Sequence, residues 1–138
     1  PMLMDTGGNS GSQSSVTVIR ALSLDELHFK DIFTVIWKEV RAAALCAIAL
    51  AAVCFGKVML VDRLLMGNTS VTVLVDLTVC LTLAVTVIVA KVVGCSLPLI
   101  AKRFGFDPAV MASPFITTIV DAMSLLLYFL FAKAILGV

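Results

Sequence analysis

The chain has 138 residues, of which 61% are hydrophobic and only 14% are charged. A typical soluble domain is about 45–50% apolar, and so short a chain has too little interior to hide the excess from water. This composition argues against a soluble enzyme, a secreted mini-protein and a disordered tail. The net charge of +1 provides no basic surface for a nucleic acid. We therefore expect an all-α integral membrane protein, a helical bundle in contact with membrane lipid.

The first 22 residues are predicted to form the end of a polar, pore-lining helix. They include the run Asp-Thr-Gly-Gly-Asn-Ser-Gly-Ser-Gln-Ser-Ser at 5–15, and such a helix must turn its polar side to protein or water. Small residues four positions apart allow close helix approach, while Asn9, Ser12 and Gln13 add side-chain oxygens. Tight packing alone is the alternative. Because the chain begins with Pro1, we expect helices upstream of it to be missing.

Residues 23–40 are predicted to form an amphipathic connector on the cytoplasmic side. Ser23 followed by Glu26 is typical of a capping box that opens a short helix. Large apolar side chains then repeat at helical spacing, which favours a helix lying along the headgroup boundary. These side chains are Phe29, Ile32, Phe33, Ile36 and Trp37.

Three segments, 41–61, 71–99 and 114–136, are apolar enough to span a membrane, which takes about 20 residues. An excess of basic residues marks the cytoplasmic side. One side receives six: Arg20, Lys30, Lys38, Arg41, Lys102 and Arg103. The other receives three: Lys57, Arg63 and Lys133. We therefore expect a multi-pass protein of the cell membrane with its C-terminus outside.

The four cysteines all lie in apolar runs, with no CxxC pair and none close in the sequence to the single histidine. This arrangement supports neither a zinc site nor a disulfide framework. We expect them to be small core residues.

Oxygen-bearing side chains recur along the third span at steps of 4, 4, 3 and 4 residues, which places them on one helical face. They are Ser113, Thr117, Asp121, Ser124 and Tyr128. Asp121 lies about 12 Å into the span at 1.5 Å per residue, near the middle of a ~30 Å hydrocarbon core. A carboxyl group bonded to a neighbouring helix is one interpretation, and a path for a hydrated cation is the favoured one. Oxygen ligands suit Mg²⁺, although these residues do not separate it from Ca²⁺, Mn²⁺ or Na⁺.

Lys91 lies at a similar depth in the second span, where a lysine must find a carboxylate, snorkel or lose its proton. We expect it to pair with Asp121 or Asp5 when the metal is absent, as a tethered cation that the metal displaces. The alternative is that Lys91 faces another helix and serves only structure. Asp76, near the start of the same span, is expected to reach the outer interface and not to form a site.

Two blocks of sequence resemble the membrane domain of the MgtE family of magnesium transporters and channels, which is related to the animal solute-carrier magnesium transporters. The first is the polar run at 5–15 with the Arg-Ala-Leu that ends at residue 22. The second runs through Gly94, Leu97-Pro98, Lys102-Arg103, Gly105, Asp107-Pro108-Ala109, Ser113-Pro114, Thr117, Thr118 and Asp121.

The resemblance implies a homodimer with five spanning helices per subunit and a pore at the dimer axis. The chain would hold the end of the second helix and all of the next three, without the first helix or the cytoplasmic gating domains. Asp121 matches the family's pore aspartate, expected to hold hydrated Mg²⁺ mainly through water. Thr117 would lend its backbone carbonyl, and the facing wall would comprise Gly8, Asn9 and Ser12. Further pore-lining or gating candidates are Asp5, Gln13, Lys91, Ser113 and Ser124.

Some positions depart from the family pattern. Ser12 and Ser113 stand where some members have asparagine, Asp5 replaces a small residue, and Lys91 replaces a neutral one.

We expect the chain to transport Mg²⁺ through a dimeric pore. A Na⁺- or H⁺-coupled divalent cation exchanger is an alternative, as is a metal-binding dimerisation module that does not conduct. The sequence has no HExxH motif, no GxSxG motif and no paired catalytic aspartates, so an enzyme is not expected.

Overall fold

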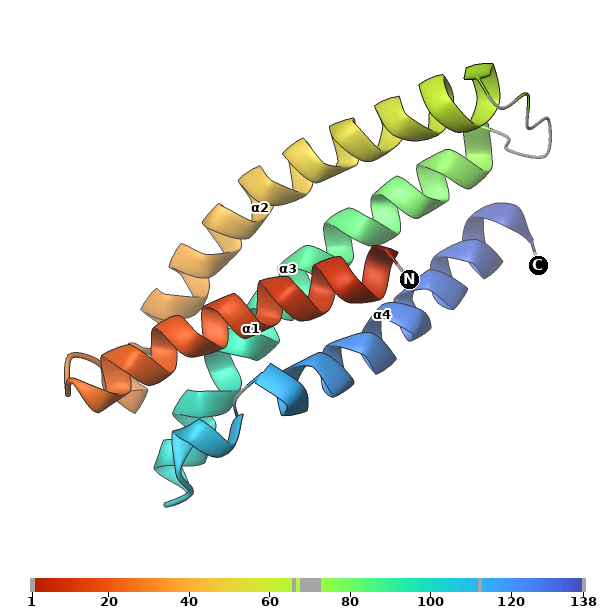
Figure 1. The fold of residues 1–138 in the computed structure, drawn as a ribbon. Coiled ribbons are helices and arrows are strands. Elements are labelled where there is room, and N and C mark those ends of the chain that lie inside the picture. Colours follow the sequence, from red (N-terminus) through yellow and green to blue (C-terminus); the bar gives the residue numbers. More distant parts are fainter. Residues whose placement is uncertain (1, 66, 68–72, 112, 138) are drawn as a thin grey trace.

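The computed structural model describes residues 2–65, 67, 73–111 and 113–137, and this part of the chain is helical without any strand. Four α-helices carry the fold (Figure 1): α1 (Met2–Ser23), α2 (Ile32–Lys57), α3 (Val73–Arg103) and α4 (Ser113–Leu136). Short 3-10 turns at Phe29–Asp31 and Pro108–Met111 precede α2 and α4, and a π-helical segment, Val58–Leu65, continues α2. The prediction of an all-α fold is confirmed.

Three helical stretches are long and apolar enough to cross a membrane: Phe29–Val61, Val73–Arg103 and Pro114–Leu136. They overlap the three predicted spans, but the first begins earlier than residue 41 and the second ends later than residue 99. The predicted break at residue 40 falls inside α2, which is continuous from Ile32. The apolar residues of the predicted connector would repeat at helical spacing in a separate interfacial helix and in a continuous α2 alike. Periodicity therefore does not distinguish the two arrangements.

The predicted capping box at Ser23 and Glu26 is wrong. Ser23 ends α1, and its hydroxyl donates a hydrogen bond to the carbonyl of Ile19 at 2.9 Å. The next helical turn begins after His28, whose backbone N–H donates to a carboxylate oxygen of Asp31 at 3.0 Å. The predicted pair (Ser23 and Glu26) and the observed pair (His28 and Asp31) are both three residues apart. The long apolar helix α2 follows the observed pair.

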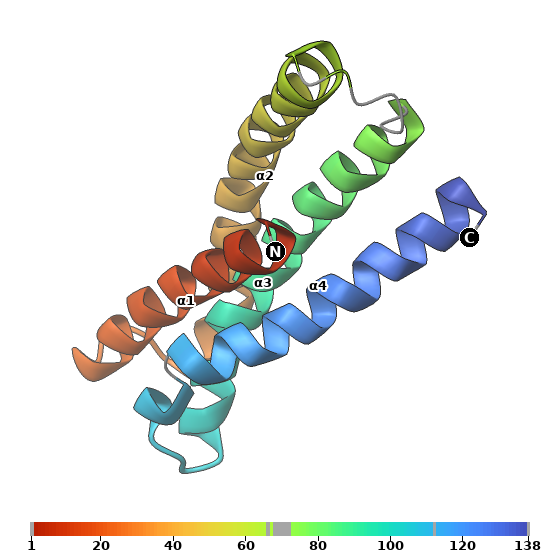
Figure 2. The same cartoon turned by 45° about the vertical axis from the view of Figure 1, so that its right-hand side comes forward.

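The central helix of the bundle is α3, which packs against α1, α2 and α4 (Figures 1 and 2). The C-terminal ends of α1 and α3 and the N-terminal ends of α2 and α4 gather at one end of the bundle. The six basic residues counted for one side therefore lie toward this end. Which side of a membrane it faces stays a prediction.

Glycines set the distance between α1 and α3. Gly11 and Gly94 are both buried, and a Cβ atom added to Gly94 would collide with the backbone of Gly11. Gly7 lies one turn earlier on the same face of α1, where an added Cβ would lie 2.7 Å from Thr86 Cγ2 of α3. The close approach expected from the small residues is confirmed, and it occurs within the chain.

Candidate cation site

A cavity of about 650 Å³ lies between α1 and α4. Five of its seven lining residues are among the predicted metal-binding or pore-lining residues: Asp5, Gly8, Asn9, Thr117 and Asp121. The other two are apolar, Met4 and Leu125. The lining carries two carboxylates and no basic side chain, so the cavity favours a cation.

Helix α4 contributes Thr117 and Asp121, which lie one turn apart and therefore on one face. The Thr117 hydroxyl donates to the carbonyl of Pro114 at 3.0 Å, in the first turn of the helix. Asp121 is half-buried. Across the described residues no donor bonds to its carboxylate, so both oxygens remain available to water or a cation.

Helix α1 contributes the opposite wall. Asp5 and Asn9 lie one turn apart on this helix and are exposed, while Gly8 between them is buried. A Cβ atom added to Gly8 would lie 3.1 Å from Thr117 Cγ2 and 3.7 Å from Asp121 Oδ1. Glycine therefore lets the α1 backbone come within reach of the Asp121 carboxylate.

Several predicted site residues lie outside the cavity lining. Ser12 is half-buried and Gln13 is exposed, both further along α1. The side chain of Ser113, the first residue of α4, falls outside the part of the chain that the structure describes. Ser124 is only 1% exposed, and its hydroxyl donates to the carbonyl of Val120 at 2.6 Å.

Packing, and not residue spacing, sets the environment of Ser124. Ser124 lies seven residues after Thr117, so the two differ by only about 20° around the helix axis. Ser124 faces Gly7, where an added Cβ would lie 3.2 Å from the serine hydroxyl oxygen. The predicted polar stripe is therefore divided between the cavity and the helix interface.

The predicted pairing of Lys91 with Asp121 or Asp5 is wrong. The Lys91 ammonium lies 3.1 Å from Glu39 Oε2 on α2 and donates to the Ser14 hydroxyl of α1 at 3.2 Å. Ser14 in turn donates to Glu39 at 2.6 Å. The two charged side chains are 14% and 18% exposed, so the three residues form a largely buried network joining α1, α2 and α3.

The sequence pair Lys38-Glu39 also fits the family pattern, but Glu39 was not predicted as the partner of Lys91, because it was placed at the end of the interfacial connector. With α2 beginning at Ile32, Glu39 lies two turns inside the helix, within reach of Lys91. Lys91 itself indicated that such a partner exists, since a cation in an apolar span requires a hydrogen-bond acceptor.

The expectation for Asp76 is also wrong. Its side chain is completely buried, and the Cys80 thiol lies 3.4 Å from its Oδ1 atom. Its position on α3 turns it toward Cys54 of α2, within the protein, and not toward the outer interface.

Comparisons with a family model and with three curated proteins all point to the same family. A family model for MgtE, described as a divalent cation transporter, matches residues 1–131. A magnesium transporter MgtE of Bacillus subtilis is 36% identical over 97% of the chain, and one of Thermus thermophilus is 33% identical over 99%. A third, from Enterococcus faecalis, is 29% identical over 93%.

The chain spans only about a quarter of the length of these relatives, 28%, 28% and 26% respectively. The matched region nevertheless includes both walls of the cavity, at Gly8 and at Asp121. The match over nearly the whole chain shows that this protein belongs to the MgtE family of divalent cation transporters.

Proposed function

We propose that this chain forms the ion-conducting part of a magnesium transporter, in which Asp121 holds the hydrated ion. The observation that carries the proposal is the Asp121 carboxylate, which lines an oxygen-rich cavity and accepts no hydrogen bond from any described residue. The relatives are named as magnesium transporters, and this supports Mg²⁺ as the transported ion.

The chemistry of the cavity suits a hydrated dication. Mg²⁺ releases its water slowly and is usually bound through one or two carboxylates while it keeps several waters. A volume of about 650 Å³ accommodates the ion with six waters, each occupying about 30 Å³. Asp121 and Asp5 would supply the charge, while the oxygens of Asn9 and Thr117 would accept hydrogen bonds from the bound waters. Ser12 and Gln13 would extend the α1 wall.

We further propose that two copies of the chain face each other across this cavity. Each copy would supply one wall of the pore and one Asp121, and two carboxylates would bind a dication more strongly than one. The basic end of the bundle would lie on the cytoplasmic side of the cell membrane and the C-terminus outside.

Uptake of Mg²⁺ into proteoliposomes that contain the purified protein tests this proposal. The wild type should move Mg²⁺, and Asp121→Asn should lower the rate at least about 10-fold, because a charged hydrogen bond is worth about 1.5–3 kcal/mol. The matched control is Glu26→Gln, which makes the same chemical change at an exposed residue between α1 and α2 and should leave the rate unchanged. Binding of Mg²⁺ by a wild type that conducts none would instead indicate a metal-binding dimerisation module.

The same vesicles distinguish a channel from a coupled exchanger. A channel carries Mg²⁺ down its own electrochemical gradient without a second ion. An exchanger requires a Na⁺ or H⁺ gradient, and its flux should stop when that gradient is dissipated. Because Lys91 is paired outside the cavity, we favour the channel.

A further inference from the structure

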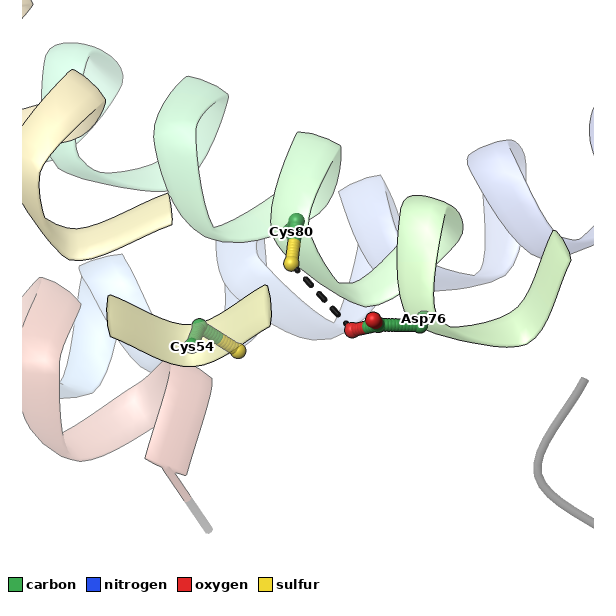
Figure 3. A group of neighbouring side chains, drawn as sticks. All are labelled: Cys54, Asp76 and Cys80. Atoms are coloured by element: carbon green, nitrogen blue, oxygen red, sulfur yellow. Dashed lines mark hydrogen bonds between the residues drawn. The ribbon is translucent and has the colours of Figure 1, made fainter. Parts of the chain in front are cut away.

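A second group of metal-binding side chains lies away from the cavity, between α2 and α3. Cys54 projects from α2, and Asp76 and Cys80 project from α3 (Figure 3). All three residues are buried, and their ligand atoms lie within 4.8 Å of one another. None of them lines the cavity at Asp121.

Asp76 has an unsatisfied oxygen in this group. The residue is 0% exposed, its Oδ1 atom lies 3.4 Å from the Cys80 thiol, and its Oδ2 atom has no hydrogen-bond partner. An ionised carboxylate there lacks a donor for Oδ2, and a protonated one lacks an acceptor. Burying such a group without a partner is costly, whereas a metal ion would satisfy it.

We propose that Cys54, Asp76 and Cys80 bind a thiophilic dication of the Zn²⁺ class and thereby join α2 to α3. Asp76 and Cys80 lie four residues apart, so helix geometry places both on the face of α3 that meets α2. Zinc binds cysteine sulfur at about 2.3 Å and carboxylate oxygen at about 2.0–2.2 Å, which puts two ligands of a tetrahedral ion about 3.5–4 Å apart. The three ligand atoms need only small shifts to reach these distances.

The donor set selects against the transported ion. Two thiolates and one carboxylate suit a borderline or soft metal, whereas Mg²⁺ requires an octahedron of oxygen ligands. The surroundings are apolar, because Leu3, Leu50 and Val79 pack against the cluster that contains the two cysteines. Water can occupy the fourth position of the metal.

Metal binding at this position would stabilise the junction between two spans. Cys54 lies three residues before the end of α2, and Asp76 lies three residues after the start of α3. The ion would therefore connect the two helices near the segment that links them. Because the thiols must lose their protons to bind, the affinity should fall as the pH is lowered.

Cobalt substitution tests the proposal on the unmodified protein. Co²⁺ added to protein purified without reductant or chelator should produce the near-ultraviolet charge-transfer band of thiolate ligands, with one equivalent bound per chain. Zn²⁺ should abolish the band, and a large excess of Mg²⁺ should not. Absence of the band, or a Cys54–Cys80 disulfide found by mass spectrometry, would overturn the proposal.

Variants of the ligands provide the second part of the test. Cys54→Ser, Cys80→Ser and Asp76→Asn should each weaken Zn²⁺ binding by at least about 100-fold, because each removes one of three ligands. Cys46→Ser is the matched control, since Cys46 is an exposed cysteine on the same helix as Cys54, and its affinity should equal that of the wild type. Circular dichroism identifies variants that have failed to fold. Equal affinity in a folded ligand variant would overturn the proposal.

Discussion

Two ionisable side chains at similar expected depth have different environments in this molecule. Asp121 lines a cavity, and none of the residues that the structure describes donates a hydrogen bond to its carboxylate. Lys91 of α3 is held by Glu39 of α2 and Ser14 of α1. The sequence could predict that both residues need a partner, but the identity of that partner depends on which helix each one faces.

Removal of the Lys91 charge should destabilise the protein without altering the cation site. Lys91→Met leaves Glu39 buried without its cation, and breaking such a pair typically lowers the free energy of unfolding by about 3–5 kcal/mol. The double variant Lys91→Met/Glu39→Gln should recover most of that loss, because no unpaired charge remains. Thermal unfolding in detergent measures both effects.

The Mg²⁺ dependence of uptake provides an independent check on Lys91. The double variant should reach half-maximal uptake at the same Mg²⁺ concentration as the wild type, since neither residue lines the cavity. A clear increase in apparent affinity would show that Lys91 competes with the ion after all.

At the scale of the helices, the seam between α1 and α3 depends on glycine. Adding a Cβ to Gly94 brings it against backbone atoms of Gly11, and backbone cannot move aside as a flexible side chain can. The composition of the first 22 residues was enough to predict close packing, but not which helix would be packed against.

Gly94→Ala should therefore lower the free energy of unfolding by about 3 kcal/mol, the upper end of the range for overpacked interiors. Gly56→Ala is the control, because Gly56 lies in α2 with no other atom within 4 Å of an added Cβ. That change should be neutral or slightly stabilising. Equal unfolding temperatures for the two variants would contradict the packing described for α1 and α3.

Helix type and number follow from the sequence because long apolar runs leave few other structures possible in a membrane. The sequence does not predict where α2 begins, since the first residues of this helix are amphipathic and equally compatible with an interfacial helix. Likewise the polar stripe of α4 predicted Thr117 and Asp121 correctly as neighbours, while the burial of Ser124 against Gly7 depends on helix packing that the sequence does not show.

At the scale of the whole molecule, the C-terminal ends of α1 and α3 and the N-terminal ends of α2 and α4 gather at one end. The six basic residues counted for one side lie in or beside these helix ends. The basic end should lie in the cytoplasm. In a variant without native cysteines, a single cysteine at Gly137 should react with a membrane-impermeant maleimide in intact cells. A cysteine at Glu26, in the segment between α1 and α2, should react only after permeabilisation. The reverse labelling would contradict the proposed orientation.

The most direct measurement is the initial rate of Mg²⁺ uptake into proteoliposomes for the wild type, Asp121→Asn and Asp121→Glu, at equal amounts of folded protein. Loss of the charge in Asp121→Asn should reduce the rate at least about 10-fold. Asp121→Glu keeps the charge in a cavity of about 650 Å³, so it should retain more activity than Asp121→Asn. A rate for Asp121→Asn equal to that of the wild type would contradict the assignment of Asp121 as the residue that holds the ion.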